Sequence, residues 1–252
     1  MFNRENVAQA KADFAEKRYC VVDNVLEEHY IQALYKAVPE MEYGVWTCIH
    51  NSHNKFRHGF KDSDEFGPIH KQFIEDARGK FSYWHYAYWL LKDHHKVHKN
   101  RFVTEFNRIV TEDYSVTKPD YTFHDLVSEV TGFTNMFTNQ PTYSYYDHTA
   151  WLNAHNDPRR WCAYIFYFNE TWLAQWGGQL CILGKDERTI VDSIEPFGNR
   201  LLIMDVSEVT GTRINKHFIS PVSITADHPR YSLAGWFYQL ETDGPSPVRS
   251  KQ

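Results

Sequence analysis

The spacing of hydrophobic positions changes near the middle of this chain. Before residue 135 the apolar residues mostly recur three and four positions apart, which is typical of amphipathic helices. From residue 135 onward they gather in short β-branched and aromatic runs separated by turn residues, which is typical of strands. We expect helices at residues 4–17, 23–39, 69–111 and 123–130, and an early strand at 19–22. We expect later strands at 140–152, 160–169, 178–183, 200–206, 217–224 and 231–240.

A block of helices followed by many strands predicts an α+β fold. The second half is expected to form a double-stranded β-helix, a cupin-like jelly roll, with the N-terminal helices packed on one sheet. A chain of 252 residues with 42% hydrophobic content is suited to one domain with a sizeable core. We therefore predict a single domain over 1–252, with mainly helical support at 1–134, the β-helix core at 135–242 and a tail at 243–252. Residues 44–67 predict either a functional lid or a pair of strands.

Composition and charge exclude several kinds of partner. The chain has 27 basic and 32 acidic residues, a formal net charge of −5 and no long basic run. We therefore expect no nucleic acid and no membrane surface as partners. No apolar run is long enough to span a bilayer, and the N-terminal residues do not resemble a secretory signal, so we expect a cytoplasmic protein. The oligomeric state is not predicted by the sequence.

Two histidines and one aspartate are candidates for a metal site. His155 and Asp157 lie two residues apart between two expected strands, and residues i and i+2 of a strand project from the same face. His217 lies in a later strand that can be brought alongside. Two histidines and one carboxylate on one face of a metal are the ligand set of non-haem iron(II) oxygenases. His94, His95 and His98 lack a third ligand, and we interpret them as a solvated helix face.

Arg230 follows the second histidine and is a candidate anchor for an acidic co-substrate, because a guanidinium offers a planar pair of donors to a carboxylate. Arg159 and Arg160 follow the metal motif directly. They either bind an anionic part of the substrate or face solvent in a turn.

These residues resemble the prolyl-4-hydroxylase-like branch of the iron(II)/2-oxoglutarate dioxygenases, which includes the HIF prolyl hydroxylases. The run 165–169, Ile-Phe-Tyr-Phe-Asn, followed by Trp172 and by Gly177-Gly178, is similar to a Tyr-Leu-Asn, Trp and Gly-Gly series of that family. The likeness extends from residues 19–26 to residues 231–238, and it is weakest over 44–120.

The resemblance implies a specific site. Iron would be held by His155, Asp157 and His217, and the distal carboxylate of 2-oxoglutarate by Arg230. Tyr167 would assist, and Tyr146 would line the same pocket, with the neighbouring Tyr145 as a competitor for that place. The pocket walls and the substrate contacts would come from Ile165, Leu180, Ile219, Trp236 and Arg159.

The cofactors implied are Fe(II), 2-oxoglutarate and O2, with ascorbate as a supporting reductant. The leading interpretation is hydroxylation of an unactivated C–H bond, with a prolyl residue of a protein or peptide as the target and with release of succinate and CO2. A second interpretation keeps this chemistry but takes a free amino acid or another small metabolite. A third, from another class, is a non-catalytic jelly-roll binding module or a cupin-like metal enzyme that does not use 2-oxoglutarate.

Overall fold

The computed structural model describes residues 1–41, 46–52, 55–59, 64–89, 101–111, 119–158, 160–207 and 216–239. The helices are α1 (Val7–Lys17), α2 (Glu28–Ala37), α3 (Phe66–Ala77), α4 (Arg101–Thr111), α5 (Phe123–Thr131) and the short 3-10 helix η2 (Ala174–Trp176). The strands are β1 (Tyr19–Asp23), β2 (Thr47–Ser52), β3 (Lys55–Gly59), β4 (Tyr83–Trp89), β5 (Met136–Tyr146), β6 (Trp151–His155), β7 (Cys162–Tyr167), β8 (Leu180–Leu183), β9 (Ile190–Ile194), β10 (Arg200–Asp205), β11 (His217–Ile219) and β12 (Arg230–Gln239). None of the helices in these ranges has the length and apolarity needed to cross a membrane.

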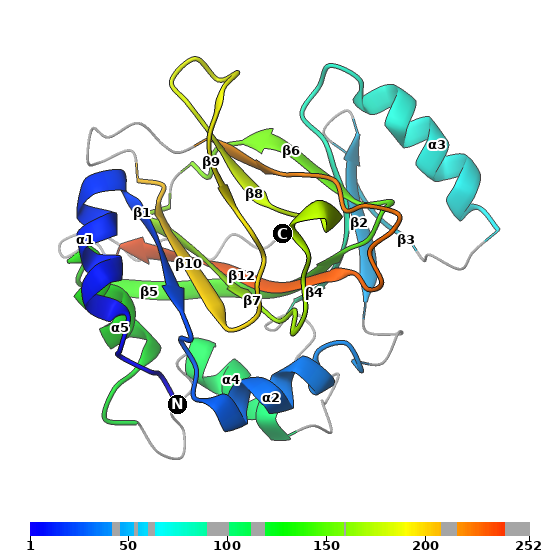
Figure 1. Cartoon of the computed structure of the whole chain (residues 1–252). Coiled ribbons are helices and arrows are strands. Elements are labelled where there is room, and N and C mark those ends of the chain that lie inside the picture. The colour runs from blue at the N-terminus through cyan, green and yellow to red at the C-terminus, as the bar shows by residue number, and fades with distance from the viewer. Residues whose placement is uncertain are drawn as a thin grey trace, which may run out of the picture.

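All the strands belong to one antiparallel sheet that curls on itself. Its order is β1-β10-β7-β12-β5-β4-β6-β11-β8-β9, and β2 and β3 extend it from β4. The curl brings β6, β11 and β8 over β5, β12 and β7 (Figure 1). This arrangement confirms the predicted double-stranded β-helix.

The two faces of the curled sheet bury two separate cores. Along β7, Tyr164 and Phe166 contribute to the core beneath the helices, whereas Ala163 and Tyr167 contribute to the core inside the curl. This alternation follows from the period of two along a strand, and both sets are apolar because both faces are covered. The candidate site therefore lies on the inner face.

The N-terminal helices cover the outer face of the sheet. Helices α1, α2, α4 and α5 lie against the side that contains β1, β10 and β5, while α3 lies beside β2 and β3 (Figure 1). Helix α5 begins with a capping box in which Thr122 accepts from the backbone of Asp125, and it ends at Gly132 in a left-handed conformation. The expected packing of helices on one sheet is confirmed.

The helix expected over 69–111 is wrong in its middle. The structure has two helices there, and strand β4 lies between them, paired with β5 and β6. The run from Phe81 to Trp89 is aromatic at nearly every second position, so its composition favours a strand more than its spacing favours a helix. Through β4, the N-terminal half of the chain contributes a strand to the same sheet as β5 and β6.

Other predicted helices and strands differ from the structure in where they begin and end. The strand expected at 140–152 is two strands, β5 and β6, and β9 was not expected. Helix α2 starts after Glu27 and is not capped by Asp23 or Asn24. Within 44–67 the described residues form the hairpin of β2 and β3, so the pair of strands is the correct alternative there. His94, His95, His98, Arg159 and the tail at 243–252 lie outside the described residues.

Candidate functional site

His155, Asp157 and His217 converge at one end of the curled sheet. Each offers one ligand atom, and these atoms lie within 4.8 Å of one another. His155 is the last residue of β6 and lies opposite His217 of β11 in the strand register, so the two imidazole rings are 4.5 Å apart. Asp157 follows β6 and places a carboxylate oxygen 3.7 Å from Nε2 of His217. The spacing expected from the sequence is therefore realised at a strand end.

The orientation of His155 is set by its own backbone. Its Nδ1 lies 2.9 Å from the carbonyl oxygen of Asn153, and because a carbonyl only accepts, Nδ1 carries the proton. Nε2 is then left with a free lone pair, as a metal ligand requires. Burial, together with the neighbouring His217, lowers the pKa of His155, which keeps the imidazole neutral.

Asp157 is held by an arginine that the sequence left undecided. Arg160 donates from Nη1 to Oδ1 of Asp157 at 2.8 Å, and the other oxygen of the carboxylate faces His217. The guanidinium carbon of Arg160 lies 4.1 Å from the ring centroid of Trp236. The side chain of Arg160 is therefore only 28% exposed, and it orients the carboxylate of Asp157 and stacks on Trp236 in the pocket wall.

Arg230 is a buried cation without an anionic partner in the described part of the chain. It is 1% exposed at the start of β12, and its Nη1 donates to Ser232 at 3.1 Å. Among the described residues, its Nε and Nη2 have no hydrogen-bond partner, and neither does the hydroxyl of Tyr167. The guanidinium carbon lies 5.1 Å from the ring centroid of Tyr146 and 4.9 Å from that of Tyr167. Burial raises the pKa of both tyrosines, so they are neutral beside this charge.

The wall behind Arg230 is built from the loop after β7. Gly178 has a φ of +70°, and a Cβ there would lie 3.0 Å from Cδ of Arg230. Only glycine allows both this conformation and this approach. The side chain of Trp172 borders the same space and donates to the carbonyl of Gly177 at 3.0 Å.

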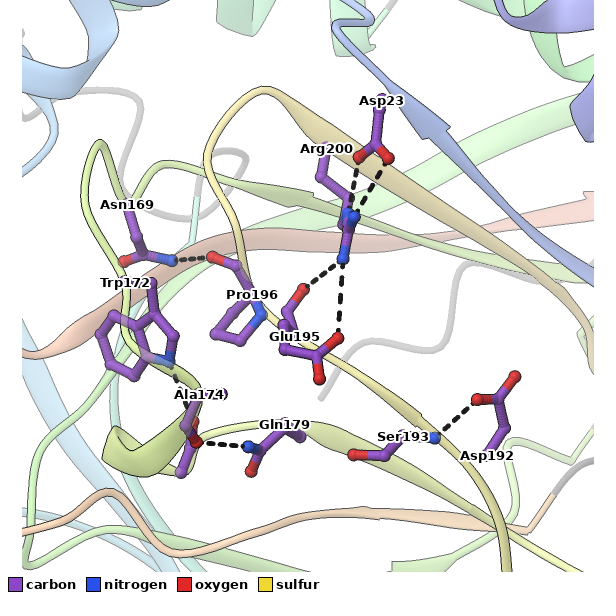
Figure 2. A network of polar contacts seen from close by, with 11 residues as sticks. Asp23, Asn169, Trp172, Ala174, Gln179, Asp192, Ser193, Glu195, Pro196 and Arg200 are labelled. Atoms are coloured by element: carbon purple, nitrogen blue, oxygen red, sulfur yellow. Dashed lines mark hydrogen bonds and ion pairs between the residues drawn. The ribbon is translucent and has the colours of Figure 1, made fainter.

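Buried amide contacts fix the start of β12 to this wall. Asn169 accepts from the backbone N–H of Tyr231 at 2.7 Å and donates to the carbonyl of Pro196 at 2.7 Å. Figure 2 shows the hydrogen bond of Asn169 to Pro196 and, beside it, Arg200 donating to Asp23 of β1 and to the carbonyl of Glu195. Tyr231, the residue next to Arg230, is thereby connected through Asn169 to the loop that contains Pro196.

The metal candidates and the arginine open into one pocket. Its lining contains five groups of residues expected from the sequence: the triad, Arg230, Tyr146, the walls Ile165, Leu180 and Ile219, and Trp236. Tyr167 packs in the same inner core. Tyr145 faces the other core, so the choice between the two neighbouring tyrosines falls on Tyr146. Arg159 lies outside the described residues and has no place here.

The sequence interpretation missed three contributors, namely Ser232, Asn169 as the support of β12, and His85 of β4, which stacks on Tyr146. A polar residue at i+2 from Arg230 was a signal for Ser232. His85 carried no signal, because its segment was expected to be helical.

The chemistry of the donors fits a divalent metal next to a carboxylate. Two imidazoles and one carboxylate on one side suit Fe(II) and leave other coordination positions open. Two N–H-bearing nitrogens of Arg230 and the hydroxyl of the neighbouring Tyr167 have no partner among the described residues, and these donors suit a carboxylate held away from the metal.

Comparison with known proteins agrees with this site. Residues 141–238 match the model of the 2OG-Fe(II) oxygenase superfamily. No curated protein matches the sequence.

Several solved structures share the fold. A prolyl-4-hydroxylase from Pseudomonas putida aligns with a TM-score of 0.56 at 16% identity, covering 93% of this chain and 99% of its own. A prolyl hydroxylase from Trichoplax adhaerens, in complex with a hypoxia inducible factor peptide fragment, aligns with a TM-score of 0.58 at 16% identity, covering 94% and 91%. The epimerase SnoN from nogalamycin biosynthesis aligns with a TM-score of 0.52 at 9% identity, covering 98% and 94%.

The matched segment begins within β5 and ends within β12, so it spans every strand that contributes a ligand atom or the buried arginine. The cofactors of this superfamily are Fe(II) and 2-oxoglutarate, with O2 as the second co-substrate. Residues 141–238, which contain the triad and the buried arginine, are therefore similar to the 2OG-Fe(II) oxygenase superfamily in sequence, and the jelly-roll fold and the three converging candidate ligands agree with that similarity.

Proposed function

We propose that this protein is an Fe(II)- and 2-oxoglutarate-dependent oxygenase that hydroxylates a prolyl residue in a protein or peptide. In this proposal His155, Asp157 and His217 hold Fe(II), and the distal carboxylate of 2-oxoglutarate lies against Arg230 and Tyr167, with Tyr146 beside it. Bound Fe(II), 2-oxoglutarate and O2 supply the oxidising chemistry, and the products are the hydroxylated substrate, succinate and CO2.

The observation that carries the co-substrate assignment is the unpaired guanidinium. Arg230 is 1% exposed and two of its nitrogens lack an acceptor among the described residues. Burying a charge without a partner costs at least about 2 kcal/mol of folding free energy. Such a charge is therefore expected where a bound ligand supplies the opposite charge. A carboxylate with two oxygens matches the fork of the guanidinium.

The side chains around the triad support the control of water and of the substrate. Ile165, Leu180 and Ile219 give the pocket an apolar lining between the triad and the arginine. Such a lining excludes water from the reacting atoms. Trp236 lies at the same pocket, and its ring is stacked under Arg160, which presents an aromatic face next to a cation. An apolar ring with an adjacent carbonyl, as in a prolyl residue, suits these two groups.

The peptide substrate is inferred from relatives of the same fold. Two of the three aligned structures described above are named prolyl hydroxylases, and one of these two is in complex with a peptide fragment. The alternative is a free amino acid or another small metabolite.

The test is a panel of proline-containing peptides and free amino acids incubated with the protein, Fe(II), 2-oxoglutarate, ascorbate and O2. The expected result is succinate release coupled to a mass increase of one oxygen, about 16 Da, on a prolyl residue of a peptide. Asp157→Ala serves as the inactive control, because it removes one of the three protein ligands. Coupled turnover with free amino acids alone would replace the peptide by the small-metabolite substrate, and no metal-dependent 2-oxoglutarate binding at all would overturn the site assignment.

A further inference from the structure

Strand β4 brings a histidine into register with the buried arginine. The pairing of Tyr86 with Tyr145 places the preceding residue of β4, His85, beside Tyr146, and Tyr146 in turn pairs with Arg230 of β12. Side chains at one register position on adjacent strands lie on the same face of a sheet. His85, Tyr146 and Arg230 therefore form a row across three strands on the inner face.

The contacts of His85 agree with this row. Its ring stacks on that of Tyr146, with centroids 4.8 Å apart and an interplanar angle of 15°. The ring is partly exposed, but its Nδ1 is buried and has no hydrogen-bond partner among the described residues. A buried imidazole nitrogen without a partner is unfavourable, and a phenylalanine would keep the stack without that cost. Stacking alone therefore does not account for a histidine here.

The imidazole is neutral at working pH. Burial, together with the charge of Arg230 and the proximity of His155, lowers the pKa of His85 to about 3. A neutral imidazole has one N–H donor and one acceptor, and the donor suits a carboxylate.

The order of the strands places His85 between the arginine and the metal candidates. Arg230 is on β12 and His155 is on β6, and going round the sheet from one to the other crosses β5 and β4. These strands present Tyr146 and then His85 to the inside. A ligand that extends from Arg230 to the triad is expected to run along Tyr146 of the pocket, and His85 lies beside that ring and interacts electrostatically with His155.

We propose that His85 is a further co-substrate-binding residue, which donates a hydrogen bond to the metal-chelating end of 2-oxoglutarate, at its C1 carboxylate. This inference rests on the proposed positions of Fe(II) and 2-oxoglutarate. It adds to the site a residue that comes from β4, outside the segment 141–238 that matches the superfamily.

Three small molecules distinguish the binding contributions of the two ends of the co-substrate. 2-Oxoglutarate has both ends, 2-oxopentanoate keeps only the chelating end, and succinate keeps the distal carboxylate. Binding of each is measured by calorimetry with Mn(II) in place of Fe(II), so that no turnover occurs. His85→Phe keeps a ring on Tyr146 but removes the donor. Arg230→Met is the matched control for the other end.

His85→Phe is expected to weaken 2-oxoglutarate and 2-oxopentanoate by about 10- to 100-fold, the range for one hydrogen bond to a charged group, and to leave succinate within about twofold. Arg230→Met is expected to weaken 2-oxoglutarate and succinate but not 2-oxopentanoate. His85→Asn, which retains a donor, is expected to lose less affinity than His85→Phe.

Unchanged 2-oxoglutarate binding in His85→Phe would overturn the inference, and so would equal losses for all three ligands, because these indicate an action through the arginine. A wild-type protein that fails to bind 2-oxoglutarate would instead overturn the proposed function itself. If His85→Phe does not fold, nitrogen NMR of the Zn(II)-loaded wild type gives the answer. The His85 resonance, identified by its loss in His85→Asn, is expected to shift with 2-oxoglutarate and 2-oxopentanoate but not with succinate, and the opposite pattern would refute the role.

Discussion

Replacement of Arg230 by methionine is predicted to stabilise the protein without its co-substrate and to abolish stabilisation by that co-substrate. The guanidinium is 1% exposed, and Nε and Nη2 have no partners among the described residues. Two unsatisfied buried donors cost about 1–3 kcal/mol each. The substitution loses the hydrogen bond to Ser232, about 1 kcal/mol, and contacts with two tyrosine rings, about 1 kcal/mol each.

Removing the buried charge also removes its desolvation cost, which adds to the gain from removing the two unsatisfied donors. We therefore expect a net gain of about 1–4 kcal/mol in the free energy of unfolding. The effect on the ligand has the opposite sign. Loss of two charge-assisted hydrogen bonds, about 1.5–3 kcal/mol each, raises the dissociation constant of 2-oxoglutarate by about 10²–10⁴. At a concentration of 100 times its dissociation constant, the ligand stabilises the wild type by about 2.7 kcal/mol.

The assay is urea denaturation followed by circular dichroism, with Mn(II), in the absence and presence of 2-oxoglutarate. Arg4→Met is the control, because the Arg4 side chain is 61% exposed and is paired with Glu129 far from the pocket. The variant Arg230→Met should be more stable than the wild type without ligand and unresponsive to it. An Arg230→Met variant that is less stable than the wild type without ligand, or that is still stabilised by 2-oxoglutarate, would refute the interpretation that Arg230 binds the carboxylate of the co-substrate.

Other changes test the remaining parts of the site. Asp157→Ala removes one of three ligand atoms within 4.8 Å, so Fe(II) or Mn(II) should be lost on dialysis and turnover abolished; retained metal, measured by elemental analysis, would contradict this. Gly178→Ala places a methyl group 3.0 Å from Cδ of Arg230 at a φ of +70°, so it should cost about 1–3 kcal/mol of stability and weaken 2-oxoglutarate, and unchanged melting and binding would argue against it. The metal-free protein should lose stability as the pH falls from about 6.5 towards 4. Burial lowers the pKa of His155 and of His85, so the unfolded chain binds more protons than the folded protein over this range. Each such group contributes a slope of up to about 1.4 kcal/mol per pH unit to the free energy of unfolding, and His85→Phe should reduce the total slope. A pH-independent denaturation midpoint over this range would refute that assignment of neutral histidines.

The part of the site that could be predicted from sequence is the part fixed by local spacing. His155 and Asp157 lie at i and i+2, so a strand end is enough to bring them together. His217 and Arg230 were predictable only as residues of later strands, and the register of the curled sheet determines which residues lie beside them. Resemblance to the family supplied that register, which no local pattern contains.

What could not be predicted depends on contacts between distant segments. Six of the nine residues 81–89 are aromatic, a composition that favours a strand without fixing its limits or its neighbours, which depend on pairing with β5 and β6. Missing that strand meant missing His85. Arg160 was left undecided for a similar reason, because its partners Asp157 and Trp236 are brought near it by different strands.

The register of β12 is the condition on which the chemistry of the pocket depends. Arg230, Ser232 and Trp236 face the pocket, whereas Leu233 and Phe237 face the core beneath the helices. A slip of one residue would exchange these faces and turn the cation into the apolar core. The register shifts once between Ala234 and Trp236, opposite residues 140 and 141 of β5, where a proline cannot donate to the ladder.

Gly235 lies at this shift, and the hydroxyl of Tyr164 occupies the space of its missing side chain, where a Cβ would be 2.2 Å away. That hydroxyl is bonded to Thr138 of β5 at 2.9 Å, so the tyrosine cannot easily move aside. One phenol thus connects three neighbouring strands at the point where their pairing changes. Because a slipped β12 would bring a side chain onto this phenol, the contact excludes the alternative register and keeps the arginine facing the triad.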